Sequence, residues 1–111
     1  MEHRTIDMKF GLPETVIENI IKVFQLESNV ESVILFGSRA KGNYKNGSDI
    51  DIAIKGSKLS FDNLLTLNQK LDELNLPYII DLIDFRSIKE RDLIEHINRV
   101  GIVIYSKKEY A

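Results

Sequence analysis

Apolar residues recur along this chain in two patterns, one typical of helices and one typical of strands. Three segments repeat apolar side chains every three or four residues, which places those side chains on one face of a helix. Four other short segments are rich in aliphatic residues and predict strands, the first of them buried on both faces. The predicted helices begin near residues 13, 60 and 87, and the predicted strands cover residues 33–36, 49–54, 78–83 and 102–105.

The helix boundaries carry recognisable start and stop signals. Pro13 suits a first helical turn, because the N–H that proline lacks would have no partner there. Ser60 can cap the second helix with its hydroxyl, and Gly101 ends the third. The order of elements predicts a single domain over residues 1–111 of the α/β (α+β) class, with a small mixed sheet of about four strands and helices packed mainly on one side.

Composition narrows the class of protein. The 111 residues have a formal net charge of −2, whereas a general nucleic-acid binder usually carries a basic surplus. The absence of cysteine excludes disulfides, a thiol nucleophile and thiolate-bound zinc. The N-terminus has charges where a signal peptide has an apolar core, and no segment predicts a membrane span. A cytoplasmic protein without a membrane partner is therefore expected.

The candidate chemistry lies between the first two predicted strands. Gly37 and Ser38 follow the first strand, where free backbone N–H groups, a residue without a side chain and a hydroxyl could receive a phosphate. Asp49 and Asp51 are two residues apart on the second strand, so both carboxylates project from one face. Two carboxylates about 4 Å apart repel by roughly 4 kcal/mol at an effective dielectric of about 20, and Mg²⁺ relieves that repulsion. The segment predicts a phosphate site beside a metal site.

A third carboxylate is available on the third predicted strand. Asp81 interrupts an apolar run, and a buried charge there needs a partner, either a metal ion or a basic side chain. Asp84 would point to the opposite face of the same strand, where it could be solvated or cap the next helix. Asp81 is therefore expected to join Asp49 and Asp51.

The run GSRAKG at residues 37–42, followed by Asp49-Ile50-Asp51, resembles the signature of the nucleotidyltransferase superfamily that includes DNA polymerase β. It is similar in particular to the minimal, single-domain members from bacteria and archaea. The family pattern of Gly-Ser, ten residues and Asp-x-Asp is matched without a gap, and arises by chance in about one chain per thousand of this length. The stretch around Asp81 resembles the family strand that supplies a third metal ligand, and residues 100–105 resemble the family terminus.

This resemblance implies a nucleotidyltransferase that uses ATP as its substrate and one or two Mg²⁺ ions. It assigns the catalytic and metal-binding roles to Asp49, Asp51 and Asp81, and the nucleotide-binding role to Gly37, Ser38, Arg39 and Lys41.

The resemblance also implies a partner. A chain of this size has no separate domain to bind an acceptor, and minimal nucleotidyltransferases are commonly paired with a small helical HEPN-domain RNase toxin. The expected function is that of an antitoxin that transfers AMP to a tyrosine of the toxin. Two alternatives stay open: an antitoxin that neutralises the toxin by binding alone, and an NTP transferase that acts on a small molecule with a helical partner subunit.

Four further side chains have an ordinary interpretation beside the functional one. Lys41 fits a solvated loop as well as a phosphate contact, and Tyr44 fits a surface position better than a stack on a base. His96 is expected to be a surface or boundary residue of a charged helix, and His3 lies in an N-terminal segment that predicts no element.

Overall fold

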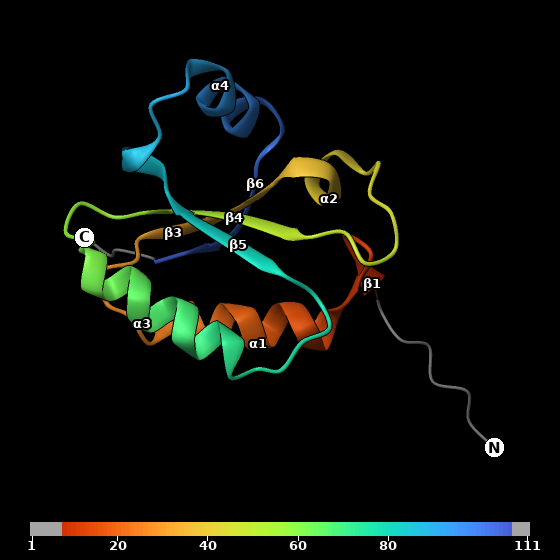
Figure 1. The fold of residues 1–111 in the computed structure, drawn as a ribbon, viewed down its shortest axis with the longest axis horizontal. Helices are drawn as coiled ribbons and strands as arrows, with labels where there is room; N and C mark the ends of the chain where they lie inside the picture. Colours follow the sequence, from red (N-terminus) through yellow and green to blue (C-terminus); the bar gives the residue numbers. More distant parts are fainter. Residues whose placement is uncertain (1–7, 108–111) are drawn as a thin grey trace.

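The computed structural model describes residues 8–107, which fold around a four-stranded mixed sheet (Figure 1). The strands are β3 (Ser32–Phe36), β4 (Ile50–Lys55), β5 (Ile80–Asp84) and β6 (Ile102–Ser106). They lie in the order β5-β4-β3-β6, so that β5 and β6 form the edges. β4 and β5 are parallel, and the other neighbouring pairs are antiparallel.

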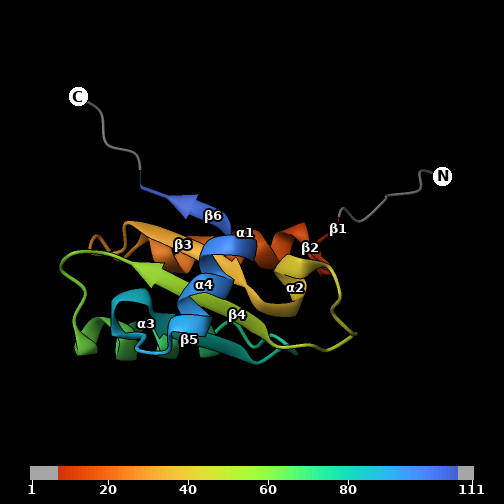
Figure 2. The same ribbon diagram turned by 90° about the horizontal axis from the view of Figure 1, so that it is seen from above.

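Helices cover both faces of the sheet, and the two longest share one face (Figure 1, Figure 2). These are α1 (Glu14–Gln25) and α3 (Phe61–Asp72), which contact each other. On the opposite face α4 (Arg91–Val100) packs against β3 and against the short helix α2 (Gly37–Lys41). The predicted small mixed sheet is confirmed, but its helices are not packed mainly on one side, because α1 and α3 cover one face and α2 and α4 lie on the other.

A short hairpin precedes the first helix. It consists of β1 (Met8–Lys9) and β2 (Leu12–Pro13), paired antiparallel. Within residues 8–107, no helix is long and apolar enough to cross a membrane. His3, the first of the two histidines, lies outside the described residues.

The first two helices begin where the sequence predicts. Pro13 precedes α1, and Ser60 caps α3. The Ser60 hydroxyl accepts from the backbone N–H of Asn63 at 3.1 Å, and the Asn63 side chain accepts from the backbone N–H of Ser60 at 3.0 Å. This reciprocal pair satisfies two N–H groups that have no partner within the helix.

The last helix begins later than predicted, at Arg91 instead of near Ser87. A 3₁₀ turn, η1 (Phe85–Ser87), intervenes after β5. The carboxylate of Asp84 caps this turn by accepting from the backbone N–H of Arg86 at 3.1 Å. The third strand is also shifted, to residues 80–84 from the predicted 78–83.

Side chains alternate along β4 between two cores. Ile50, Ile52 and Ile54 pack on the side of α1 and α3 and are at most 1% exposed. Ala53 belongs to the smaller core on the side of α4. Because successive side chains of a strand point to opposite faces, Asp51 shares the face of Ala53. The larger core therefore anchors the strand that carries the candidate acids.

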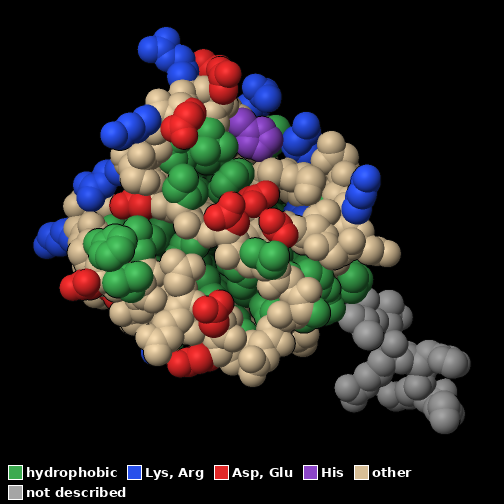
Figure 3. Space-filling view, in the orientation of Figure 1, with side chains coloured by type: hydrophobic (Ala, Val, Ile, Leu, Met, Phe, Trp, Pro, Cys, Tyr) green, Lys and Arg blue, Asp and Glu red, His purple; other side chains and the backbone are tan. Residues whose placement is uncertain are grey.

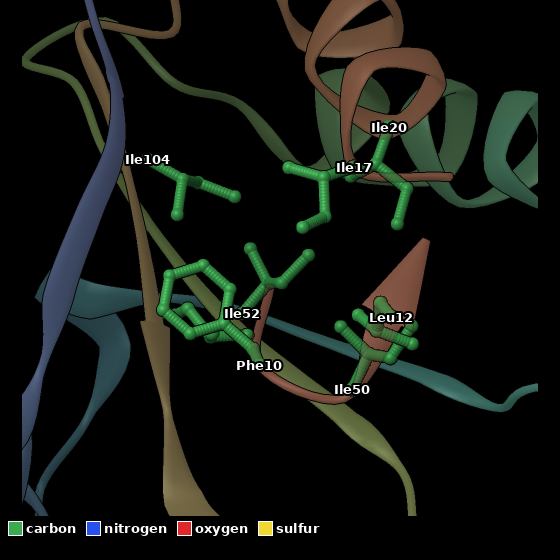
Figure 4. A pocket seen from close by; sticks show the side chains of 8 residues that line it. Phe10, Leu12, Ile17, Ile20, Ile50, Ile52 and Ile104 are labelled. Atoms are coloured by element: carbon green, nitrogen blue, oxygen red, sulfur yellow. The ribbon is translucent and has the colours of Figure 1, made fainter. Parts of the chain in front are cut away.

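An apolar pocket lies in the larger core, between the sheet, α1 and the N-terminal hairpin (Figure 4). Its side chains point toward one another and include no polar group that could orient a charged ligand. It is lined by Phe10, Leu12, Ile17, Ile20, Leu35, Ile50, Ile52 and Ile104.

Candidate active site

Two of the three predicted acids lie side by side on neighbouring strands. The parallel register of β4 and β5 pairs Asp51 with Asp81, and the antiparallel register of β3 and β4 pairs Asp51 with Phe36. Paired residues of adjacent strands present their side chains on the same face, here the face of α4. Asp49 immediately precedes β4, two residues before Asp51. The structure thus brings together the predicted acids.

Asp51 lies within the electrostatic field of the other two predicted acids. The pKa of Asp51 is raised above its ordinary value of 3.8, first because the half-buried carboxyl loses solvation and then because Asp81 and Asp49 repel its charge. Asp49 and Asp81 themselves are exposed. Acidic side chains gather near the middle of the face shown in Figure 3, with a histidine beside them.

The surroundings of Asp81 differ from the prediction. The sequence suggested a buried charge within an apolar run, but Asp81 is exposed because β5 is an edge strand of the sheet. Asp84 is half-buried and caps η1, which is one of the two roles that the sequence left open for it. The choice of Asp81 as the neighbour of Asp51 therefore agrees with the register, although the reason given for it was wrong.

Gly37 lies against the acidic cluster at the start of α2. Its φ of +75° is a left-handed conformation that side chains disfavour. A Cβ atom here would also overlap Oδ2 of Asp51. The backbone can therefore approach the carboxylate this closely only because residue 37 has no side chain. Ser38 follows it and is half-buried.

His96 joins the site from α4. The backbone N–H of Gly37 donates to Nε2 of His96 at 3.2 Å, and the imidazole meets the ring of Phe36 edge-on at a centroid distance of 6.2 Å. The side chain is half-buried, as expected for a boundary residue. Sequence reasoning missed its contact with the glycine, since no local pattern links residues that are 59 positions apart.

Arg39 is placed in the interior, where it holds three backbone segments together. It is 2% exposed, and Nε and Nη2 donate to the carbonyl of Ser48 at 3.1 and 2.8 Å while Nη1 donates to the carbonyl of Phe10 at 2.9 Å. The guanidinium lies over the rings of Tyr44 and Tyr78, 5.3 and 5.2 Å from their centroids. A phosphate contact, which the sequence suggested, would require the guanidinium to leave these partners.

The arginine contacts bear on the metal site indirectly. Ser48 precedes Asp49, so the bidentate contact from Arg39 fixes the backbone directly before the first acid. Lys41, also predicted to bind the nucleotide, is exposed at the end of α2. Tyr44 is 36% exposed and packs over Arg39, which accounts for its position without a base.

The chemistry of the donor set fits a hard divalent cation. Carboxylate oxygens are ligands that Mg²⁺ takes in proteins. The pKa of Asp51 is raised first by burial and then by repulsion from Asp81 and Asp49, and a bound cation would stabilise the charged carboxylate. Among residues 8–107, no three acidic or histidine side chains stand close enough together to hold a metal ion as they are. Side-chain rotations of the exposed Asp49 and Asp81 would have to complete the site.

The comparison with protein families decides what kind of site this is. Residues 18–110 match the family model described as "Polymerase beta, Nucleotidyltransferase". The chain belongs to this nucleotidyltransferase family. The resemblance carried by the Gly-Ser and Asp-x-Asp motifs is thereby confirmed.

The relatives of this nucleotidyltransferase include a curated protein and two solved structures of toxin–antitoxin complexes. It is 38% identical over 102 residues to a Haemophilus influenzae protein named "Probable protein adenylyltransferase MntA", a match that covers 91% of this chain and 82% of the relative. A crystal structure of a toxin–antitoxin with AMP-PNP is similar, with a TM-score of 0.68 and 28% identity over 83% of this chain and 74% of that chain. So is a complex of the tri-AMPylated Shewanella oneidensis HEPN toxin with MNT antitoxin, with a TM-score of 0.63 and 25% identity over 85% and 72%.

Gly37→Ala should disrupt the site more than a matched glycine substitution. Gly42 has a similar φ of +88° but open space where a Cβ atom would stand, so Gly42→Ala carries only the conformational cost, about 1 kcal/mol of unfolding free energy. Gly37→Ala adds the overlap with Asp51. We expect both variants to lose stability in urea unfolding and only Gly37→Ala to lose AMP-PNP binding. Equal loss of binding in both would contradict the role of this close approach.

Arg39→Met should act on stability. It leaves the carbonyls of Ser48 and Phe10 without their donor, which costs on the order of 2 kcal/mol or more, whereas Lys41→Met should stay within about 0.5 kcal/mol. Thermal and urea unfolding measure the difference. An Arg39→Met protein with unchanged stability but lost affinity for nucleotide would instead establish a phosphate contact.

Asp51→Asn should stabilise the metal-free protein. Because the carboxyl pKa of Asp51 is raised in the folded state, folding loses stability as the pH rises from the ordinary value of 3.8 through the folded value. The uncharged side-chain amide of the Asp51→Asn variant removes that loss of folding stability. In EDTA at about pH 7, Asp51→Asn should melt at a higher temperature than the wild type, and the gap should narrow as the pH falls towards 4. A lower melting temperature at neutral pH would contradict the electrostatic description.

Proposed function

We propose that this chain is a Mg²⁺-dependent adenylyltransferase that transfers AMP from ATP to a tyrosine hydroxyl of a partner HEPN toxin, and that it thereby acts as the antitoxin. The observation that carries the proposal is the register that sets Asp51 beside Asp81, with Gly37 against the same carboxylate. The relative named as a protein adenylyltransferase and the complexes with AMP-PNP and with an AMPylated toxin support it. A cytoplasmic location belongs to this proposal, because ATP is the donor.

The three acids and the Gly37–Ser38 turn have different roles in the proposed reaction. Asp49, Asp51 and Asp81 would hold one or two Mg²⁺ ions. When bound, the metal neutralises the triphosphate and favours in-line displacement at its α-phosphorus. Gly37 lets the triphosphate approach the backbone, and the hydroxyl of Ser38 can donate a hydrogen bond to it.

The acceptor hydroxyl must lose its proton during the transfer. As the acceptor oxygen forms a bond to the α-phosphorus, an exposed carboxylate of the cluster takes the proton from the hydroxyl. The bond between the α-phosphorus and the bridging oxygen breaks, and pyrophosphate leaves. A tyrosine suits this role because its phenol, with a pKa of about 10, gives up a proton more readily than an aliphatic hydroxyl.

The open position of the acids favours an acceptor on another chain. Asp49 and Asp81 are exposed, and Asp81 lies on an edge strand. The apolar pocket of the larger core offers no polar group to a substrate. A protein that docks over the edge could present its hydroxyl directly to the cluster.

Transfer should depend on Asp81 and not on Asp84. With ATP, Mg²⁺ and a HEPN-domain toxin as the partner, the wild type should add the mass of adenylate to that partner, and EDTA should abolish the addition. Asp49→Asn and Asp81→Asn should lower the rate by orders of magnitude, because the cluster loses a ligand. Asp84→Asn should change it only a few-fold, because that side chain caps η1 on the other side of the strand. Intact-mass spectrometry measures each.

Three outcomes would contradict the proposal. If Asp84→Asn were the inactive variant among folded proteins, the acid assignment would be wrong. If the wild type and Asp49→Asn protected cells from the partner equally and neither added adenylate, neutralisation would occur by binding alone. Adenylate found on a small molecule, with none on the partner, would favour the small-molecule transferase.

A further inference from the structure

α4 supplies none of the three candidate acids, but one of its side chains contacts the site. α4 packs on the face of the sheet that carries the acids and contacts α2. His96 projects from it to Gly37, whose backbone N–H donates to Nε2 at 3.2 Å. This is a contact between the backbone of the glycine turn and a side chain 59 residues away.

The imidazole is held in place by packing. In this contact Nε2 of His96 is the acceptor for the backbone N–H of Gly37. The edge-on packing against Phe36, at 79° between the ring planes, limits rotation of the ring. Phe36 is itself 8% exposed and belongs to the smaller core, together with Ile97 of α4. The hydrogen-bond acceptor, Nε2 of His96, is therefore held in position by core packing.

Gly37 is consequently held from two sides. The carboxylate of Asp51 occupies the space where a side chain would stand, and the imidazole of His96 engages the N–H. The ring also lies near the carboxyl of Asp51. One residue thus touches the turn and adjoins the acid.

We propose that His96 is a positioning residue of the nucleotide site: by accepting from the Gly37 N–H it fixes the Gly37–Ser38 turn against Asp51, so that the turn receives the triphosphate in one orientation. The inference rests on the proposed function of the same site. His96 acts through the turn and takes no part in the chemical step. Removal of the His96 imidazole should therefore weaken binding of the nucleotide more than binding of the protein acceptor.

Two substitutions separate the hydrogen bond from the packing. The amide oxygen of His96→Gln can reach the position of Nε2 and accept from Gly37, whereas His96→Leu fills similar space without an acceptor. Asn98→Leu, at an exposed position of the same helix, controls for the added leucine. All four proteins are compared in their melting temperatures before any other measurement.

The first measurement needs neither metal nor nucleotide. Amide hydrogen exchange followed by NMR should show the Gly37 N–H protected in the wild type, in His96→Gln and in Asn98→Leu. It should exchange faster in His96→Leu, with the protection of the β3 and β4 amides unchanged. Equal protection of Gly37 in His96→Leu would overturn the inference, because the turn would then be held without the imidazole.

The second measurement concerns function. Calorimetry with AMP-PNP and Mg²⁺ should show His96→Leu weakened by roughly threefold to tenfold, the effect of one hydrogen bond, and His96→Gln close to the wild type. In adenylate transfer, the KM for ATP should rise in His96→Leu while the KM for the partner protein stays unchanged. An unchanged affinity for AMP-PNP, or an equal loss in His96→Gln and His96→Leu, would overturn the inference.

The two proposals fail in different ways. A wild type that transfers no adenylate contradicts the proposed function, whereas the exchange and AMP-PNP measurements still decide the role of His96. A His96→Leu variant that transfers adenylate with the KM for ATP of the wild type contradicts only the positioning role.

Discussion

The repulsion between carboxylates on adjacent strands is the constraint around which this fold is arranged. The parallel register of β4 and β5 sets Asp51 against Asp81, and partial burial of Asp51 raises the cost of its charge. The apolar side of β4 compensates, because Ile52 and its neighbours on that side are packed against α1 and α3. One strand thus joins the larger hydrophobic core on one face to a cluster of acids on the other. Such a loss of stability in favour of activity is common at functional sites.

Two structural features let the backbone surround these charges. Gly37 approaches Asp51 more closely than any residue with a side chain could, and His96 engages the N–H of that glycine. Arg39 acts at a greater distance by binding the carbonyl of Ser48, directly before Asp49. The other contacts of its guanidinium are to a second backbone carbonyl and to two tyrosine rings. The sequence suggested that Arg39 contacts phosphate, but in this structure Arg39 supports the backbone directly before one of the candidate acids.

The features that could be predicted from the sequence are those with a local signal. Apolar spacing and caps placed α1, α3 and the four strands of the sheet, and the spacing of Gly37, Asp49 and Asp51 led to the correct family. The exposure of Asp81 could not be read in this way, since it follows from β5 lying at the edge of the sheet, and strand order is a property of the whole fold. The contacts of Arg39 with Phe10 and of His96 with Gly37 were missed for a similar reason, because these partners lie 29 and 59 positions away.

The edge position of β5 also bears on how the proposed reaction would be controlled. A site that encloses its substrates excludes water by itself, but a cluster with two exposed acids does not. In the proposed transfer, the docked partner would supply the hydroxyl and would also cover the acids from solvent. Electrostatic interactions strengthen when water is excluded, so the metal and the triphosphate would be held most firmly only while the acceptor is in place. In the proposed transfer, an open site would therefore couple catalysis to binding of the protein acceptor.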